Sequence, residues 1–149
     1  MNELNFTIEK PETFSGKFIK GKARPFVVKK GWAFSPKSNF EKLLKQYAIQ
    51  NTPENWDKNG VFGVEIACYF EFLKKDTKEY CKENGGGWYH KKPDIDNIAK
   101  AVLDCLNSVV WVDDNSVASL KIDKFYQNFK DEKELINIKI KRLTISDKV

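Results

Sequence analysis

An alternation of apolar and other residues between positions 62 and 72 is the longest regular pattern in this sequence. The apolar positions lie two residues apart and comprise Phe62, Val64, Ile66, Cys68, Phe70 and Phe72. Because successive side chains of a β-strand point to opposite faces of its sheet, this period predicts a long strand with one buried face. The fold must therefore include a sheet whose apolar face is covered by other elements.

Shorter apolar patterns predict further strands around this one. These lie at residues 4–8, 109–112, 117–126 and 134–143. Residues 26–28 and 32–34 predict a basic hairpin, because Lys29-Lys30-Gly31 between them supplies two cations and a turn glycine. The hairpin would place its charges at an exposed tip.

Two amphipathic helices are also predicted. The first covers residues 36–50, with Ser35 as N-cap and Pro36 as first residue, and the second runs from residue 96 to about 107. Strands and helices follow one another without a regular βαβ rhythm. We therefore predict an α+β fold with one mixed β-sheet and two main helices packed on it. At 149 residues, we expect one domain over residues 1–149, with a long glycine-containing loop at 74–93.

The amino-acid composition argues against several classes of protein. With 41% hydrophobic residues and 11 phenylalanines, the chain can bury a core without disulfides or metal ions. Cys68, Cys81 and Cys105 show no Cys-x-x-Cys spacing, which argues against a disulfide framework and a zinc site. Because the N-terminus lacks a signal-peptide pattern and no segment has the length of a membrane span, we expect a soluble, cytoplasmic protein.

Positive charge is concentrated near the N-terminus. The net charge is +5, yet no acidic residue stands between Glu12 and Glu41. Seven cations lie there: Lys17, Lys20, Lys22, Arg24, Lys29, Lys30 and Lys37. A solvated lysine-rich loop would explain this segment, but so would phosphate contacts by the last six of them. Since only two arginines are present, a DNA partner would be recognised by its backbone and shape rather than by its bases.

Acidic residues flank the second predicted helix. Pro93 disfavours helix before it, so Asp94 and Asp96 are expected in extended chain with their side chains on one side. Two adjacent carboxylates repel each other unless a cation lies between them, and Mg²⁺ prefers such hard oxygen ligands. Asp113 and Asp114 follow the predicted 109–112 strand, which we expect beside the 62–72 strand, so they could close the same site.

Simpler structural roles exist for each of these residues. Asp94 and Asp96 could cap a helix and favour its dipole, and Asp113-Asp114-Asn115 could form only a turn. Lys100 could pair with Asp96 one helical turn away, or could offset charge on a phosphate. Four acids around one helix of a basic protein favour the metal site.

These motifs together resemble a known family. KPDIDNIAKAVLDCLN followed by VVWVDDNSV is similar to the signature of RusA-type crossover junction endodeoxyribonucleases, the RusA-type Holliday junction resolvases. That signature has the form Asp-x-Asp-Asn-x-x-Lys, then Leu-Asp-x-Leu, then Asp-Asp before a strand. The segment GKARPFVVKKGWAFSPK resembles the basic hairpin of the same family. The resemblance covers residues 16–125.

The resemblance implies an α+β homodimer that nicks four-way DNA junctions symmetrically with Mg²⁺, or with Mn²⁺ as an alternative. It implies metal-binding roles for Asp94, Asp96 and Asp114, and makes Lys100 the essential lysine. Asp113 also matches a family aspartate, and its role is not separated from that of Asp114. Two departures are Phe26, where the family often has an arginine, and the length of the glycine-rich loop.

The expected reaction is hydrolysis of a DNA phosphodiester in recombination and repair. One or two Mg²⁺ ions held by the acids would activate water, with electrostatic help from Lys100. No serine or cysteine with an adjacent histidine suggests covalent catalysis. The alternatives are a non-catalytic protein that binds branched DNA and a metal-dependent RNase.

Overall fold

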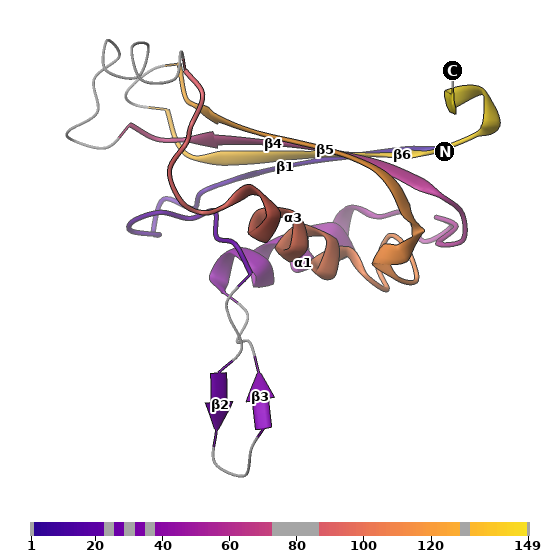
Figure 1. Cartoon of the computed structure of the whole chain (residues 1–149), viewed down its shortest axis with the longest axis horizontal. Coiled ribbons are helices and arrows are strands. Elements are labelled where there is room, and N and C mark those ends of the chain that lie inside the picture. The colour runs from indigo at the N-terminus through magenta and orange to yellow at the C-terminus, as the bar shows by residue number, and fades with distance from the viewer. Residues whose placement is uncertain are drawn as a thin grey trace.

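A computed structural model of the chain describes residues 2–22, 26–28, 32–34, 38–72, 87–128 and 132–148, with the backbone alone at 26–28 and 32–34. A four-stranded sheet forms its centre (Figure 1). Its strands are β1 (Glu3–Glu9), β4 (Phe62–Phe70), β5 (Val117–Tyr126) and β6 (Leu135–Arg142). The strand order is β1-β6-β4-β5, and only β4 and β5 run parallel, so the sheet is mixed as predicted.

Two helices, α1 (Asn39–Asn51) and α3 (Ile95–Leu106), lie on one face of the sheet and contact each other (Figure 1). Two 3₁₀ turns, η1 (Asp114–Ser116) and η2 (Ile145–Lys148), precede β5 and follow β6. The prediction of one α+β domain with two helices on a mixed sheet is confirmed. Within the described ranges, no helix is long and apolar enough to cross a membrane.

The core lies between the helices and the sheet. The alternating side chains of β4 are buried on the helix side, and the register aligns Phe6 of β1 with Ile138 of β6 and Ile66 of β4. From the other layer, α3 contributes Ile98 and Val102, both fully buried. The side chains that alternate along the strands and those at helical spacing in α3 thus pack together in one apolar layer.

One predicted boundary and one predicted strand are wrong. The first helix begins at Asn39 rather than residue 36, because Ser38 is its N-cap and accepts a hydrogen bond from the Glu41 amide at 3.2 Å. A Ser-x-x-Glu capping box therefore sets the start. Residues 109–112 form turns and not a strand, although Asn107 and Trp111 make an isolated bridge. Val110 and Trp111 of this run are fully buried in the core, whereas Val112 is exposed.

The predicted hairpin is present as a separate two-stranded sheet (Figure 1). Its strands are β2 (Phe26–Val28) and β3 (Trp32–Phe34), paired antiparallel with Phe26 opposite Phe34. The cations predicted at its turn, Lys29 and Lys30, lie outside the described residues, as does most of the predicted 74–93 loop.

Candidate metal and nucleic-acid site

The start of α3 exposes the first acidic pair. Asp94 is the N-cap residue in extended conformation, and its carbonyl accepts from the Ile98 amide at 3.1 Å. Its carboxylate makes no capping hydrogen bond, so this exposed group is not committed to the helix. Asp96 is helical rather than extended, which makes the extended-chain argument for the pair wrong at that residue. Both carboxylates nevertheless lie at the positive end of the helix dipole.

The second acidic pair belongs to η1. Asp113 is its extended N-cap residue without a side-chain capping bond, and Asp114 is its first residue. Partial burial raises the pKa of Asp114, and the charge of Asp113, a hydrogen bond with Asp113 and the charge of Asp104 act in the same direction. These three carboxyl groups therefore repel one another when ionised. The strands beside β4 are β6 and β5, and β5 follows Asp113 and Asp114, so the prediction that a strand before them lies beside β4 was wrong.

The two acidic pairs lie at opposite ends of α3. Asp94 and Asp96 lie at its start, whereas η1 contacts the helix and Asp114 is close enough to feel Asp104 in the last turns (Figure 1). Asp96 and Asp104 are about 12 Å apart along the helix axis, from a rise of 1.5 Å per residue. Accordingly, the part of the chain that the structure describes contains no group of three or more His, Cys, Asp or Glu side chains suited to a metal ion.

Lys100 lies one turn after Asp96 and is exposed. The ion pair that would explain Lys100 structurally does not form, since no described acid lies within 4.0 Å of its ammonium. Its side chain therefore remains available at the same surface as the first acidic pair.

A basic arm, defined here as residues 17–22, lies across the first turn of α3. The Lys22 amide donates to the Asn97 carbonyl at 2.9 Å. Gly21 is needed there, because a Cβ atom at this position would be 2.6 Å from the Asn97 Cβ. The arm therefore places Lys20, which is exposed, beside the helix that carries Asp94 and Asp96.

Of the six predicted DNA-binding cations, two lie on the described arm. Lys20 is exposed, but the Lys22 ammonium lies 3.4 Å from the buried carboxylate of Glu41 and 3.6 Å from Asp104. Lys22 therefore has a structural role that sequence reasoning missed. The remaining four, Arg24, Lys29, Lys30 and Lys37, lie outside the described residues.

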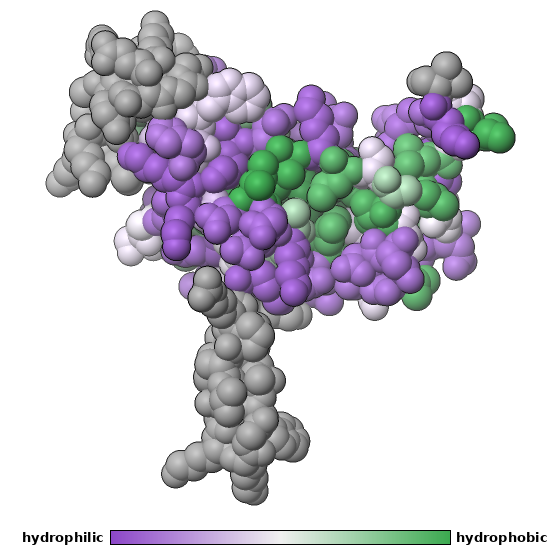
Figure 2. Space-filling model, viewed as in Figure 1, coloured by the Kyte–Doolittle hydropathy of each residue, from purple (hydrophilic) through white to green (hydrophobic). Residues whose placement is uncertain are grey.

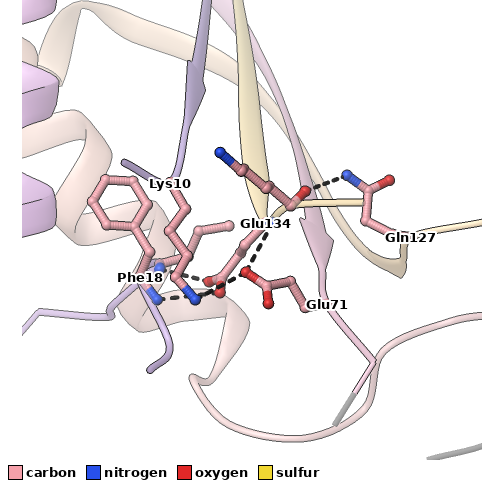
Figure 3. Close-up of polar contacts among 7 residues, drawn as sticks. Lys10, Phe18, Glu71, Gln127 and Glu134 are labelled. Carbon is pink, nitrogen blue, oxygen red and sulfur yellow. Dashed lines mark hydrogen bonds and ion pairs between the residues drawn. The ribbon is translucent and has the colours of Figure 1, made fainter. Parts of the chain in front are cut away.

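A buried carboxylate anchors the arm. Glu134, which is 3% exposed, accepts hydrogen bonds from the amides of Phe18 at 3.2 Å and Ile19 at 2.6 Å (Figure 3). Burial raises the pKa of Glu134, and these two hydrogen bonds oppose that shift. The Glu134 amide in turn donates to Glu71, which pairs with Lys10 at 2.9 Å. No local pattern marks this anchor, because Glu134 and Phe18 are 116 residues apart.

Two lysines hold the segment before Asp94. Lys17 donates to the Lys92 carbonyl at 2.7 Å and to the Tyr89 hydroxyl at 2.5 Å. Lys124 donates to the carbonyls of Lys91 at 2.7 Å and Pro93 at 2.8 Å. Burial lowers the pKa of both lysines, and the nearby charge of Asp94 opposes the shift at Lys124.

Sequence reasoning missed both of these functions. A signal for Lys124 does exist, because it follows Leu120 and Ile122 at spacing two and shares their face of β5, where a cation is out of pattern.

Comparison with known proteins gives these residues a context. The profile of the family Endodeoxyribonuclease RusA matches residues 18–141, which is most of the chain. The chain belongs to the RusA endodeoxyribonuclease family. The resemblance inferred from the motifs is thereby confirmed, and the matched range includes both acidic pairs and Lys100. RusA family endodeoxyribonucleases are phosphodiester hydrolases, so the acids of α3 and η1 lie in a nuclease fold.

One relative of this RusA family member is an uncharacterized protein, YqaN, from Bacillus subtilis (strain 168). It is 38% identical over 94 residues, which cover 57% of this chain and 65% of YqaN. The chain thus matches slightly less than two thirds of the length of that relative. The name of YqaN states no activity.

Proposed function

We propose that this chain is a Mg²⁺-dependent endonuclease that resolves four-way DNA junctions by paired symmetric nicks, in DNA recombination and repair. The observation that carries the proposal is the N-cap carboxylate of Asp94. In a chain of the RusA family, it is exposed, makes no capping bond, and has a basic arm packed on its helix. A protein that only binds DNA gains nothing from bare carboxylates where phosphate must approach.

The proposed metal ligands form two pairs, Asp94 with Asp96 on α3 and Asp113 with Asp114 of η1, and because the length of α3 separates them, each pair would hold its own ion. Their carboxylate oxygens are the hard donors that Mg²⁺ takes, usually one or two from protein, with water and phosphate completing the shell. Mn²⁺ accepts the same donors. When bound, the metal would supply an activated water and offset charge on the scissile phosphate.

The remaining side chains of the site bind and orient the substrate. Lys100 presents an exposed ammonium one helical turn from Asp96, where it can offset charge that develops on a phosphate oxygen. Lys20 on the basic arm extends the positive surface past the first turn of α3. With Arg24, Lys29, Lys30 and Lys37 farther along the same segment, these cations would follow the DNA backbone.

A homodimer is part of the proposal, because a four-way junction needs one nick in each of two opposed strands. Support comes from the outer edge of β5, which within the described ranges pairs with no strand between Val117 and Asp123. Hydrophobic residues gather across the face formed by α3 and β5 (Figure 2), and Ile95, Val112 and Leu120 are 41%, 63% and 42% exposed. A free strand edge beside an apolar surface suits a second copy of the chain.

Cleavage of three labelled substrates tests the activity. A four-way junction, a linear duplex of the same sequence and a structured RNA are each incubated with and without Mg²⁺. We expect symmetric nicks in the junction only, and only with the metal. Binding of the junction without cleavage at any Mg²⁺ or Mn²⁺ concentration would favour the non-catalytic alternative, and cleavage of the RNA would favour the RNase.

A further inference from the structure

Three successive backbone carbonyls precede Asp94, and side-chain donors hold all of them. Lys124 donates to the carbonyls of Lys91 and Pro93, and Lys17 donates to that of Lys92, at distances of 2.7–2.8 Å. The Tyr89 hydroxyl adds a second bond to the Lys92 carbonyl at 3.0 Å. We call Lys17 and Lys124 with these carbonyls the carbonyl clamp.

The clamp joins three distant parts of the chain. Lys124 extends from β5, which is itself fixed in the sheet by β4, and Lys17 extends from the basic arm anchored by Glu134. The sequence separations are 33 residues for Lys124 to Lys91 and 75 for Lys17 to Lys92. The rigid sheet thereby fixes the backbone position from which the Asp94 carboxylate extends.

Each lysine is held in an unfavourable place for a charge. Both side chains are partly removed from solvent, and both ammonium groups approach the Tyr89 ring, at 5.2 Å for Lys17 and 5.4 Å for Lys124. The two cations also repel each other. Desolvation of two like charges is unfavourable unless strong bonds offset it, and charge-assisted bonds to carbonyls are of that kind.

We propose that Lys17 and Lys124 are positioning residues that set the Asp94 carboxylate for metal binding by holding the carbonyls of residues 91–93. This inference rests on the proposed function for its metal. Mutation of a residue that orients a metal ligand without touching the metal commonly lowers metal affinity or activity by about 10- to 100-fold. Lys124 is the better test, because it bonds the Pro93 carbonyl adjacent to Asp94.

The direction in which Lys124→Met changes Mg²⁺ affinity distinguishes a positioning role from a purely electrostatic one. Lys124 is a positive charge close enough to Asp94 for each to affect the other. If Lys124 acted only through its charge, removing the charge would tighten Mg²⁺ binding. If it positions the carboxylate, Lys124→Met weakens Mg²⁺ binding even though a repulsive charge has been removed. A direct phosphate contact would instead weaken junction binding and shrink its salt slope by about 0.9.

The experiment compares wild type with Lys124→Met, Lys124→Arg and, as a matched control on the neighbouring part of the sheet, Lys139→Met, whose side chain is exposed on the face away from the helices. Mg²⁺ affinity is measured without DNA by calorimetry, and cleavage kinetics are measured on a four-way junction. For Lys124→Met we expect Mg²⁺ affinity and kcat to fall about tenfold with junction affinity unchanged. We expect Lys124→Arg, which keeps charge and donors, to recover most of the loss. Tighter Mg²⁺ binding or weaker junction binding in Lys124→Met would overturn the proposal.

Amide hydrogen exchange tests the clamp even if the chain proves to cut nothing. In Lys124→Met, exchange should accelerate at the amides of residues 94–98, including the Ile98 amide bonded to the Asp94 carbonyl. Amides of β1 and β6 should keep their wild-type rates. Unchanged exchange at residues 94–98, or an equal acceleration throughout the sheet, would also contradict the positioning role.

Discussion

The Asp94 carboxylate does not accept the hydrogen bond that an N-cap side chain usually accepts from a backbone amide of its helix. An aspartate at an N-cap normally accepts from a first-turn amide, which stabilises a helix by about 1 kcal/mol. Here Ser38 makes such a bond for α1, whereas Asp94 makes none for α3. An exposed carboxylate that makes no capping bond is suited to an external ligand. This residue and Asp96 could be picked out from sequence, but the missing cap bond could not.

At Asp96, charge removal should separate cleavage from binding. Asp96→Asn keeps the size of the side chain but removes the negative charge that is proposed to hold Mg²⁺ and that repels phosphate. We expect cleavage of a four-way junction to be lost while junction affinity is unchanged or increased. Gel shift without metal and cleavage with Mg²⁺ measure the two effects. Glu65→Gln, an exposed acid on β4 facing away from the helices, is the control and should behave as wild type.

Retention of wild-type cleavage rates by Asp96→Asn would remove Asp96 from the metal site. Loss of both cleavage and folding would be seen in circular dichroism and would require Asp94→Asn in its place, for which the same pair of outcomes is expected.

Buried thiols should resist alkylation in the native protein. Burial raises the pKa of Cys68 to about 12 from the ordinary value of 9.0. At pH 8 this leaves about a thousandfold less thiolate than in a free cysteine, and thiolate is the reactive form. We expect iodoacetamide to label Cys68 in guanidinium and not in buffer, as measured by peptide mass spectrometry. Fast labelling of Cys68 in buffer would mean that the sheet opens readily.

The same shift has a consequence for stability. Since the folded pKa of Cys68 is raised, unfolding releases its proton above pH 9, so its contribution to stability is complete below that pH and declines toward pH 12.

At the scale of elements, periodicity determined what could be predicted. The alternation along β1, β4 and β6 and the apolar stripe of α3 indicated those elements almost to the residue, because burial of one face fixes both period and register. The failures come from competing local signals. Ser35-Pro36 and Ser38 with Glu41 are both patterns typical of a helix start, and only the second is used. The run at residues 109–112 resembled a strand because Val110 and Trp111 are apolar, but they are buried from within a turn.

The cations of the basic hairpin and of the segment just before it should contact the DNA backbone. Replacing Arg24, Lys29 and Lys30 together by glutamine should weaken binding to junctions of every sequence by a similar factor. The slope of log affinity against log salt should decrease by about 0.9 for each phosphate that the variant no longer neutralises. Fluorescence anisotropy over a range of salt measures both quantities. Glutamine at Lys58, Lys139 and Lys148, three exposed lysines elsewhere, is the matched control.

If the hairpin triple variant keeps both the affinity and the salt slope of the wild type, the cationic segment serves only solubility. An equal loss of affinity in the control variant would instead assign the effect to net charge.

At the scale of the whole molecule, contacts between distant segments decide how the site is built, and these lay outside sequence reasoning. Glu134 reaches Phe18 and Ile19, and Lys124 reaches the turn before Asp94, across separations that no local pattern encodes. The sequence also led us to expect the two acidic pairs to lie closer together than they do in the structure. The length of α3 separates them, because Asp114 lies toward the end of the helix at whose start Asp96 lies.

Assembly should follow from the free edge of β5 and the apolar surface beside it. Pairing two β5 edges about a two-fold axis would satisfy their open backbone groups, and would cover Leu120 and its neighbours on α3. Sedimentation should therefore give a mass near twice 17.3 kDa. A buried charge opposes such packing, so Leu120→Lys should shift the protein to monomer, while Ile145→Lys, at an 88% exposed site near the C-terminus, should remain dimeric.

A dimer carries two copies of the acidic site to one junction, so both nicks can occur before it dissociates. We expect the wild type to linearise a supercoiled cruciform plasmid within a single binding event, and Leu120→Lys to accumulate nicked circles. A wild-type particle that sediments as a monomer and yields only nicked circles would refute the dimer and leave the nuclease intact. If Leu120→Lys remains dimeric with paired cutting, the two copies meet through a different surface, and the β5 edge serves neither assembly nor symmetry of the nicks.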